Sequence, residues 1–275
     1  MAKNLNSIRI ATLNVHFFRD LHGISNAERL GEILQPLALD VLAVQEAYHK
    51  ELPDEKVKTD RYYLNYLSTL LQLPHRAFCS TNNDFGNGLL SKFPLLSTSN
   101  HHVDQILIYN RRGMLEAKID HPFFHENRAK LFVTHLDQIK ESIRMKQWDT
   151  FEANLQNSSS TVQLLMGDFN ALTRDDYSDD YFEKFICDVR SRNNWEMPQD
   201  IFTRRLKNSG FIDCWREMNE NLKDEQTVTC AYGTRIDYIW RRGTLTDGWK
   251  IKECFKFSSN DATDHNGILL MLIKE

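Results

Sequence analysis

The sequence predicts an α/β fold, because a strand, a helix and a buried strand follow one another near its start. Residues 8–15 are rich in β-forming residues, which predicts a strand. Ser25 and Glu28 form the pattern of a capping box, and residues 30–37 behind it place leucine and isoleucine on one helical face. Residues 40–46 form an apolar run closed by an acid, which is typical of a strand buried on both faces. This succession favours an α/β arrangement.

A second block of the chain repeats the same layout. Residues 130–137 are predicted to form a strand, residues 138–155 a helix, and residues 162–166 a buried strand after a loop at 157–160. The two blocks share no exact sequence repeat, but their matching order predicts pseudo-symmetric halves of one core. No linker or sustained shift in composition divides the chain. We therefore expect residues 1–275 to form a single domain.

The remaining segments add strands and helices around these two blocks. A helix is predicted at 60–73 and ends before Pro74, and a half-buried antiparallel strand is predicted at 113–119. Residues 85–94 combine a glycine-rich turn with a short strand. Further along, a helix is expected to start at 211–215, and strands are expected at 235–240, 251–257 and 268–273.

Composition and charge limit the classes of function. The chain has 275 residues, of which 41% are hydrophobic and 26% charged, the balance of a soluble globular protein. Its net charge is −4 and its pI is about 6.2, so it lacks the basic surface of proteins that hold nucleic acid by bulk charge. A phosphate-bearing substrate must therefore be held locally, by a metal ion or a few arginines.

The cysteines and the N-terminal residues bear on the cellular compartment. The five cysteines are odd in number and no pair has a C-x-x-C spacing, so we expect free thiols in a reducing compartment. Residues 1–6 contain no apolar signal segment, and no run approaches the length of a membrane span. These features predict an intracellular protein, cytoplasmic or nuclear. They give no indication of an obligate protein partner.

Polar side chains follow several predicted core strands. Asp168 and Asn170 come directly after the strand at 162–166, two residues apart, so both can point the same way. A carboxylate beside a carboxamide suits a water nucleophile and a phosphate oxygen, although glycine, Asp and Asn are also ordinary turn residues. Asn14, Glu46 and His135 likewise close predicted strands. Alpha/beta proteins usually build their sites where such groups collect.

Two further segments carry chemistry-bearing residues. Asp264 and His265 lie just before the closing strand, and Asp237 lies between apolar neighbours in the strand at 235–240. An acid within such a strand is usually paired. The polar segment 175–200 has two interpretations. It is either a solvated insertion, or a substrate-contacting loop in which Trp195 stacks on a base and Arg190 and Arg192 meet phosphate.

Seven short motifs, taken together and in order, resemble the endonuclease/exonuclease/phosphatase superfamily. They are Thr12-Leu13-Asn14-Val15, Gln45-Glu46, Gly86-Asn87-Gly88-Leu89-Leu90-Ser91-Lys92, Thr134-His135-Leu136-Asp137, Gly167-Asp168-Phe169-Asn170, Arg235-Ile236-Asp237-Tyr238-Ile239 and Thr263-Asp264-His265. Each motif is weak alone, but all seven span nearly the whole chain. The resemblance implies a four-layer α/β sandwich, in which two packed mixed β-sheets are flanked by helices.

The resemblance also implies metal-assisted hydrolysis of a phosphate ester. Glu46 resembles the family's principal Mg²⁺ ligand, with Asn14 and Asp264 near the ion and Mn²⁺ as the alternative metal. Asp168 would orient and deprotonate the attacking water, and Asn170 would donate to a phosphate oxygen in the transition state.

The remaining site residues complete this implied mechanism. His265 would contact the phosphate, or act as the base in a competing version, while Asp237 holds its tautomer. His135 resembles a second, phosphate-contacting histidine. Asn87 would lie in a loop that faces the substrate.

The chain departs from the family pattern at two places. His16 stands where some nucleases of the family carry an acid that helps the metal, and here it would either bind phosphate or merely flank the site. Arg111 and Arg112 are candidates for the tyrosine or arginine that the family usually has on its middle loops.

The family resemblance leaves several substrates open. We expect a phosphodiester in nucleic acid, cleaved by an endonuclease or a DNA-end phosphodiesterase. The alternatives are a phosphatase or phospholipase C-type hydrolase acting on an inositol phosphate or sphingomyelin, and a non-catalytic binding module.

Overall fold

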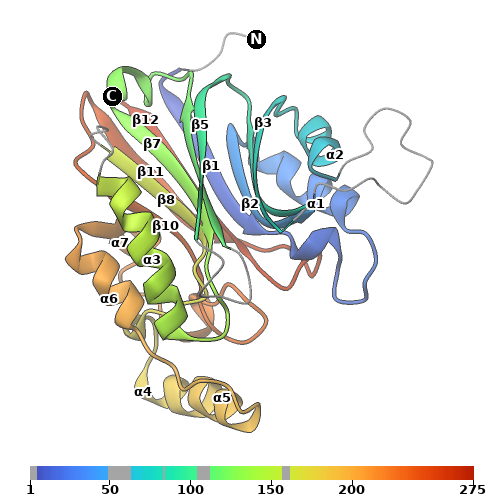
Figure 1. Cartoon of the computed structure of the whole chain (residues 1–275), viewed down its shortest axis with the longest axis vertical. Coiled ribbons are helices and arrows are strands. Elements are labelled where there is room, and N and C mark those ends of the chain that lie inside the picture. The colour runs from blue at the N-terminus through green and yellow to red at the C-terminus, as the bar shows by residue number, and fades with distance from the viewer. Residues whose placement is uncertain (1–4, 49–62, 83, 104–111, 157–161) are drawn as a thin grey trace.

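Two β-sheets packed face to face form the centre of the molecule, and helices cover their outer faces (Figure 1). The computed structural model describes residues 5–48, 63–82, 84–103, 112–156 and 162–275. In these residues each sheet has six strands. The predicted four-layer α/β sandwich is therefore confirmed.

The first sheet has the strand order β11-β12-β1-β2-β4-β3. Its strands are β1 (Ser7–Asn14), β2 (Val41–Tyr48), β3 (His75–Asn82), β4 (Phe85–Ser91), β11 (Trp249–Phe257) and β12 (Gly267–Lys274). The second sheet has the order β5-β6-β7-β8-β10-β9. Its strands are β5 (Leu95–His102), β6 (Gly113–Ile119), β7 (Ala129–His135), β8 (Val162–Asp168), β9 (Phe211–Asp213) and β10 (Asp237–Arg242).

The two sheets have matching topology, as the sequence layout predicts. Each contains one parallel pair at its centre, β1 with β2 in the first sheet and β7 with β8 in the second. The other pairings are antiparallel in both. Parallel neighbours end at the same edge of a sheet, so polar residues after β1 and after β7 and β8 gather at one edge.

Alternation along the central strands explains why they read as continuous apolar runs. Ile8 and Ile10 of β1 enter the core between the sheets, whereas Ala11 and Leu13 pack in the layer with the helices of the first sheet. In β8, Leu164 and Met166 face the core between the sheets and Leu165 faces outward. Both faces of these strands are thus covered, which is the burial that the sequence predicts.

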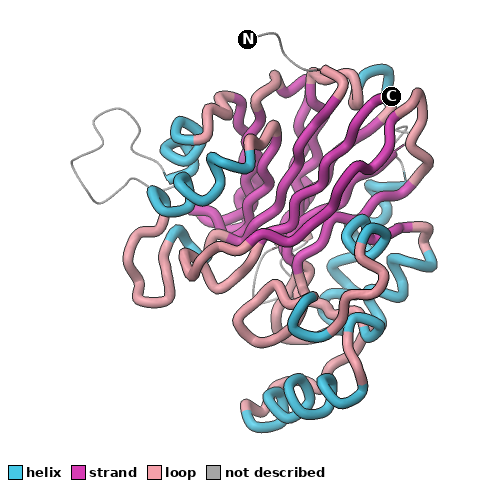
Figure 2. Tube along the Cα trace, turned by 180° about the vertical axis from the view of Figure 1, so that it is seen from behind, coloured by secondary structure: helices cyan, strands magenta, loops and turns pink. Residues whose placement is uncertain are grey.

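Helices complete the outer layers (Figures 1 and 2). On the first sheet, α1 (Ala27–Leu34) and α2 (Tyr63–Leu70) contribute to one apolar layer. On the second sheet, α3 (Glu141–Gln156) and α6 (Ile201–Asn208) contribute to another. The short helix α7 (Cys214–Met218) follows β9. Residues 60–62 and 157–160, which belong to predicted elements, lie outside the described residues.

Several local predictions are corrected by the structure. Asn26, and not Ser25, precedes the first turn of α1, and it makes no side-chain cap. Residues 211–213 form strand β9 before the helix begins. The glycine-rich segment at 85–91 is strand β4 and not a turn, because the glycines let it approach its neighbours closely: a Cβ at Gly86 would lie 2.0 Å from the carbonyl oxygen of Cys79. The strands β3 and β5 carry no strong sequence signal and were not predicted.

The segment 175–200 is partly helical and projects from the sandwich as an arm at the bottom of Figure 1. It contains α4 (Asp179–Tyr181), a π-helical turn at Phe182–Cys187, and α5 (Asp188–Arg192). Trp195 is exposed and its ring meets that of Tyr232 edge-on at 5.1 Å. Arg192 pairs with Asp188.

The prediction of free thiols is confirmed, since all five cysteines lie in the described residues and none is disulfide-bonded there. No helix in the described part of the chain is both long and apolar enough to cross a membrane.

Candidate active site

Polar side chains from both sheets meet at the edge where the central strands end. Asn14 closes β1, His135 closes β7 and Asp168 closes β8. The side chains of Asn14 and Asp168 join the sheets directly, because Asn14 Nδ2 donates to Asp168 Oδ2 at 3.0 Å. Both residues are buried. The two halves of the core thus contribute to one shared cluster.

Asp168 lies at the centre of this cluster. Its second oxygen, Oδ1, accepts a hydrogen bond from the backbone N–H of Asn170 at 2.9 Å. Gly167 before it has a φ of +139°, and a Cβ there would lie 1.9 Å from the carbonyl oxygen of Thr134, so only glycine allows β8 to approach β7 this closely. Burial, together with the nearby charge of Asp237, raises the pKa of Asp168 to about 7.

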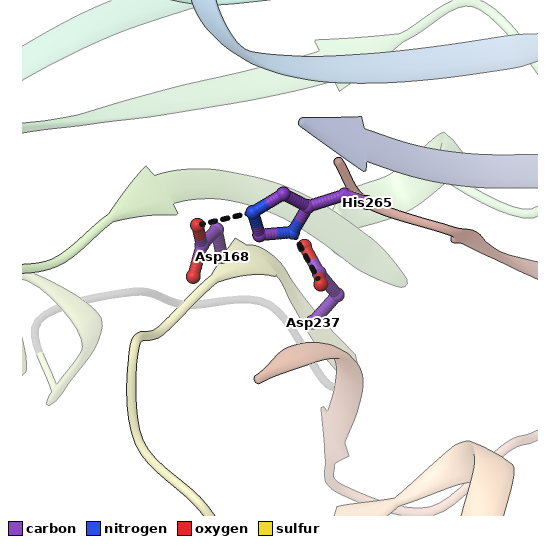
Figure 3. A group of neighbouring side chains, drawn as sticks. All are labelled: Asp168, Asp237 and His265. Carbon is purple, nitrogen blue, oxygen red and sulfur yellow. Dashed lines mark hydrogen bonds and ion pairs between the residues drawn. The ribbon is translucent and has the colours of Figure 1, made fainter. Parts of the chain in front are cut away.

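His265 lies between two carboxylates (Figure 3). Its Nδ1 is 2.8 Å from Asp237 Oδ2, and its Nε2 is 3.8 Å from Asp168 Oδ2. Burial disfavours the charged imidazole, but the Asp237 carboxylate outweighs it and raises the pKa of His265 well above its usual value. The pairing predicted for Asp237 therefore exists, and its partner is His265.

Hydrogen bonds to backbone groups hold the segment that carries Asp264 and His265 against the sheet. Thr263 Oγ1 donates to the carbonyl oxygen of Asn14 at 2.9 Å, and Ala231 N donates to that of Asp264 at 2.9 Å. Thr229 Oγ1 accepts from the N–H groups of Ile236 and Asp237. These bonds fix the start of β10 and the residues before β12 relative to β1.

A buried ion-pair network stabilises the same region. Arg235, which is fully buried, binds Asp176 with Nε at 2.7 Å and Asp213 with Nη2 at 2.6 Å. Its guanidinium also lies over the ring of Tyr238, whose hydroxyl donates to the carbonyl oxygen of Ala171 at 3.0 Å. The arginine of the Arg235-Ile236-Asp237 motif thus ties the start of β10 to the segment that follows Asn170.

His135 joins the cluster from the end of β7. Its Nε2 lies 3.0 Å from Asn170 Nδ2, 3.5 Å from Asp168 Oδ2 and 3.9 Å from Glu46 Oε1. Its Nδ1 lies 2.9 Å from Nη1 of buried Arg112. Burial and the Arg112 charge lower the pKa of His135 well below its usual value, so this histidine is neutral.

Arg112 is the site residue that the sequence left undecided. Besides His135 it contacts Gln138, and it is buried just before β6. Arg111, the other candidate for the same position in the family pattern, lies outside the described residues. A charged residue before a glycine carries little signal by itself, so the contact with His135 is what shows that Arg112 reaches the cluster.

Glu46 does not close its strand, contrary to the prediction. Strand β2 continues to Tyr48, and Glu46 lies in a β-bulge where the register against β4 shifts between Val44 and Ala47. Its φ is +54°, a backbone conformation that non-glycine residues rarely adopt. A bulge changes the direction of a side chain, and here it directs Glu46 towards His135 and Asn14. Burial raises the pKa of Glu46, and the Asp264 carboxylate adds to this effect.

The structure shows whether the predicted metal ligands have oxygen atoms that suit a cation. Glu46 Oε2 is buried and has no hydrogen-bond partner in the described residues, which a cation would supply. Glu46, Asn14 and Asp264 offer oxygen donors, the kind that Mg²⁺ takes. Ligand atoms of Asp168, Asp237 and His265 also lie within 4.8 Å of one another. Because His265 and Asp237 bind each other in that set, we consider the Glu46 set the better fit.

Of the two predicted substrate-binding residues, Asn87 is placed differently from the expectation, and His16 flanks the site, which is one of the two positions expected for it. Asn87 lies within β4, opposite the bulge, and is buried with Nδ2 donating to the carbonyl oxygen of Gly113 at 2.9 Å; it is not in a loop. His16 directs Nδ1 to the carbonyl oxygen of Arg19 at 3.0 Å, while its backbone N–H donates to Asn14 Oδ1 at 3.0 Å. It therefore orients Asn14 through its main chain.

The fold and this cluster define a class of phosphoester hydrolase. The family model described as "Endonuclease/Exonuclease/phosphatase family" matches residues 11–265, and the chain belongs to this family. Members of the family hydrolyse phosphoester bonds. A search of curated proteins finds no match to the chain.

Solved structures with the same fold include three informative neighbours. An endonuclease/exonuclease/phosphatase from Beutenbergia cavernae has a TM-score of 0.70 at 17% identity, over 98% of this chain and 72% of that one. The human nocturnin catalytic domain, solved with a bound sulfate anion, has 0.66 at 15%, over 98% and 95%. The TDP2 protein of D. rerio, in complex with a single-strand DNA product, has 0.64 at 16%, over 97% and 98%. These likenesses confirm the fold.

Proposed function

We propose that this protein is a divalent-metal-dependent phosphodiesterase that cleaves nucleic acid, as an endonuclease or a DNA-end phosphodiesterase. The observation that carries the proposal is the position of His265, whose Nδ1 is held by Asp237 while its Nε2 faces Asp168 at 3.8 Å. Glu46, with its unpartnered buried oxygen, lies 3.9 Å from His135 in the same cluster. The proposed base Asp168, the His265 imidazolium and the proposed cation site would thus act on one phosphate.

Glu46, Asn14 and Asp264 would hold the metal, which we propose is Mg²⁺, with Mn²⁺ as a substitute. When bound, such an ion polarises a phosphoryl oxygen and stabilises the leaving oxygen. Asn14 would also fix Asp168, since its amide already donates to that carboxylate.

Asp168, Asn170 and the two histidines would act on the reacting groups themselves. Asp168 would orient the attacking water and accept its proton. Asn170 would donate from its carboxamide to a non-bridging phosphate oxygen, and neutral His135 would offer a second donor. The His265 imidazolium, stabilised by Asp237, would place a positive charge against the phosphate.

Nucleic acid is the substrate we favour within the family. The D. rerio TDP2 neighbour was solved with a DNA product, and the proposed active site needs no basic surface because the ion and His265 supply local positive charge. We further propose that residues 1–275 act as one catalytic domain, in keeping with a family match over 11–265. An inositol phosphate or sphingomyelin substrate is the alternative.

A hydrolysis panel in Mg²⁺ tests this proposal. The substrates are single-stranded and duplex DNA, RNA, DNA with a 5′-tyrosyl end, an inositol polyphosphate and sphingomyelin, each with intact protein and with His265→Ala. Cleavage of nucleic acid that is lost in the variant supports the proposal. Cleavage of only the lipid or inositol substrate overturns the choice of substrate. No hydrolysis and no metal binding would favour a non-catalytic binding module.

A further inference from the structure

Three aromatic side chains that lie within two or three residues of predicted site residues along the chain form a cluster. Phe17, Tyr48 and Phe85, here called the aromatic cluster, all contact one another. Phe17 and Phe85 stack with ring centroids 5.1 Å apart and planes inclined by 22°. Tyr48 lies 5.8 Å from Phe17 and 5.6 Å from Phe85. Phe17 is 37% exposed although the rings of Phe85, Tyr48 and His16 all contact it, so part of its side chain stays open to solvent.

The cluster is joined to the candidate site by short stretches of backbone. Tyr48 follows Glu46 by two residues on β2, and Phe85 precedes Asn87 by two residues on β4. Tyr48 and Phe85 are direct partners across these two strands. Phe17 follows Asn14 by three residues. A ligand whose phosphate meets the ion that Glu46 would hold can therefore extend towards these rings.

The turn that carries Phe17 is strained and firmly held. His16, Phe17 and Phe18 have φ values of +46°, +58° and +56°, three successive left-handed residues without a glycine. Such conformations cost free energy and persist where the surroundings impose them, often at functional sites. Here Phe18 is buried and stacks on Tyr63 at 5.2 Å, and its carbonyl oxygen accepts from Asn26 N at 3.2 Å. Burial of Phe18 thus holds its neighbour Phe17 at the surface.

We propose that the aromatic cluster is a stacking site for a nucleobase of the nucleotide next to the scissile phosphate. This inference rests on the proposed function and names how the substrate is held. A chain with net charge −4 gains little from bulk attraction to phosphates. Base stacking on aromatic rings does not depend on charge and contributes about 1–3 kcal/mol per base. DNA and RNA share this chemistry.

A lipid surface is the competing occupant. Leu21 and Ile24 are exposed on the loop that follows Phe17. The nucleobase is favoured because Phe17 and Phe85 already stack with nearly parallel planes, an arrangement that a planar ligand continues. The cluster also lies on the strands that carry Glu46 and Asn87, whereas Leu21 and Ile24 lie further along the loop.

Fluorescence of 2-aminopurine, which is quenched on stacking, tests the site. The probes are single-stranded DNA and RNA oligonucleotides with 2-aminopurine near one end. Matched oligonucleotides carry an abasic analogue at that position, and their binding is measured by the fluorescence anisotropy of an end label. Binding is measured in Ca²⁺ and again in EDTA. The variants are Phe17→Ala, Phe17→Leu, which keeps apolar area without a ring, and Phe17→Tyr, which keeps the ring. Phe185→Ala, an exposed phenylalanine on the projecting arm, is the matched control.

The proposal expects quenching by the intact protein, by Phe17→Tyr and by Phe185→Ala. Phe17→Ala and Phe17→Leu should bind the base-bearing probe roughly 5- to 100-fold more weakly, and the abasic probe no differently from the intact protein. Comparing the DNA and RNA arms shows which polymer is preferred. Equal quenching by all variants, or none by the intact protein, overturns the stacking site.

Two further arms separate this result from other failures. If the intact protein quenches the probe but the hydrolysis panel shows no cleavage of nucleic acid, the proposed reaction fails while the stacking site stands. The vesicle arm uses phosphatidylcholine–sphingomyelin vesicles with Phe17→Ala and with a Leu21→Ala/Ile24→Ala variant. If both variants lose vesicle binding and no variant affects quenching, the aromatic cluster binds lipid and the proposal is wrong. Melting temperatures of the Phe17 variants are measured beside that of the intact protein, because Phe17 also packs against Tyr48 and Phe85, so that loss of folding is told apart from loss of stacking.

Discussion

Arg112 Nη1 lies 2.9 Å from His135 Nδ1, and this contact determines which imidazole nitrogen carries the proton. A guanidinium has only donors, so Nδ1 must be the acceptor and neutral His135 carries its hydrogen on Nε2. That N–H faces Asp168 Oδ2 at 3.5 Å. The Asn170 carboxamide, 3.0 Å from the same nitrogen, can turn its oxygen towards the proton only by giving up the hydrogen bond of its Nδ2 to the carbonyl oxygen of Leu136. Arg112 therefore acts as a positioning residue for His135.

Replacing Arg112 should affect turnover through His135. Arg112→Met removes the donor and should lower kcat roughly 10- to 100-fold, the range seen when an orienting partner of an active-site group is lost. Arg112→Lys keeps a donor and should recover part of this loss. ¹⁵N-labelled histidine spectra should report the Nε2–H tautomer of His135 in the intact protein and a mixture in Arg112→Met. An unchanged tautomer together with unchanged kcat would contradict the role.

Glu46→Gln should abolish stabilisation by Mg²⁺. A ligand at about 100 times its Kd stabilises a protein by about 2.7 kcal/mol, which a thermal melt detects. Without metal, Glu46→Gln should melt no lower than the intact protein, because the substitution removes a buried charge that the Asp264 carboxylate repels. Glu32→Gln, on the exposed side of α1, is the control and should keep the shift. An undiminished Mg²⁺ shift in Glu46→Gln would exclude Glu46 as a ligand.

Asp237→Asn should lower kcat by roughly 100-fold or more while KM changes little, since Asp237 acts on His265 and not on the bound substrate. The amide can still occupy the site, so the variant should fold. Steady-state kinetics on the substrate found in the panel measure both constants. Asp261→Asn, an exposed aspartate in the same part of the chain, should behave as the intact protein. A change confined to KM would mean that Asp237 serves binding.

His121 should make stability fall in acid independently of the active site. It is fully buried against Phe93 and Trp249, and burial lowers its pKa from 6.5 to about 4. Between these values the unfolded chain binds a proton that the folded chain excludes. Its contribution is therefore complete above pH 6.5 and is lost as the pH falls towards 4, by up to about 3 kcal/mol.

Urea unfolding at pH 7 and at pH 4.5 checks this expectation. His121→Phe removes the titrating group, so its free energy of unfolding should fall less over this interval than that of the intact protein. The comparison uses the difference between the two pH values, because the variant also loses the hydrogen bond from Phe123 N to His121 Nδ1. Equal losses in both proteins would show that His121 does not carry the effect.

Much of the fold could be predicted because the local pattern of apolar and polar residues shows which faces of a strand are buried. Residues 8–15 and 162–166 are apolar on both faces, and both are central strands. The edge strands β3 and β5 escaped prediction, since an edge strand such as β5 is largely exposed and shows weak patterning. For part of strand β4 the sequence predicts a turn, because glycines are typical of turns. In the structure these glycines allow close packing of β4 and not chain reversal.

Local patterns in the sequence show that polar groups follow the core strands, since period-two alternation and chain order place Asn14, His135 and Asp168 at strand ends. The other features of the site depend on tertiary contacts. The bulge that directs Glu46 depends on its register against β4, and the choice of Arg112 as the partner of His135 depends on a contact 23 residues apart. The aromatic cluster joins three segments through sheet pairing and a strained turn. Such contacts depend on register and backbone direction, and local sequence patterns record neither.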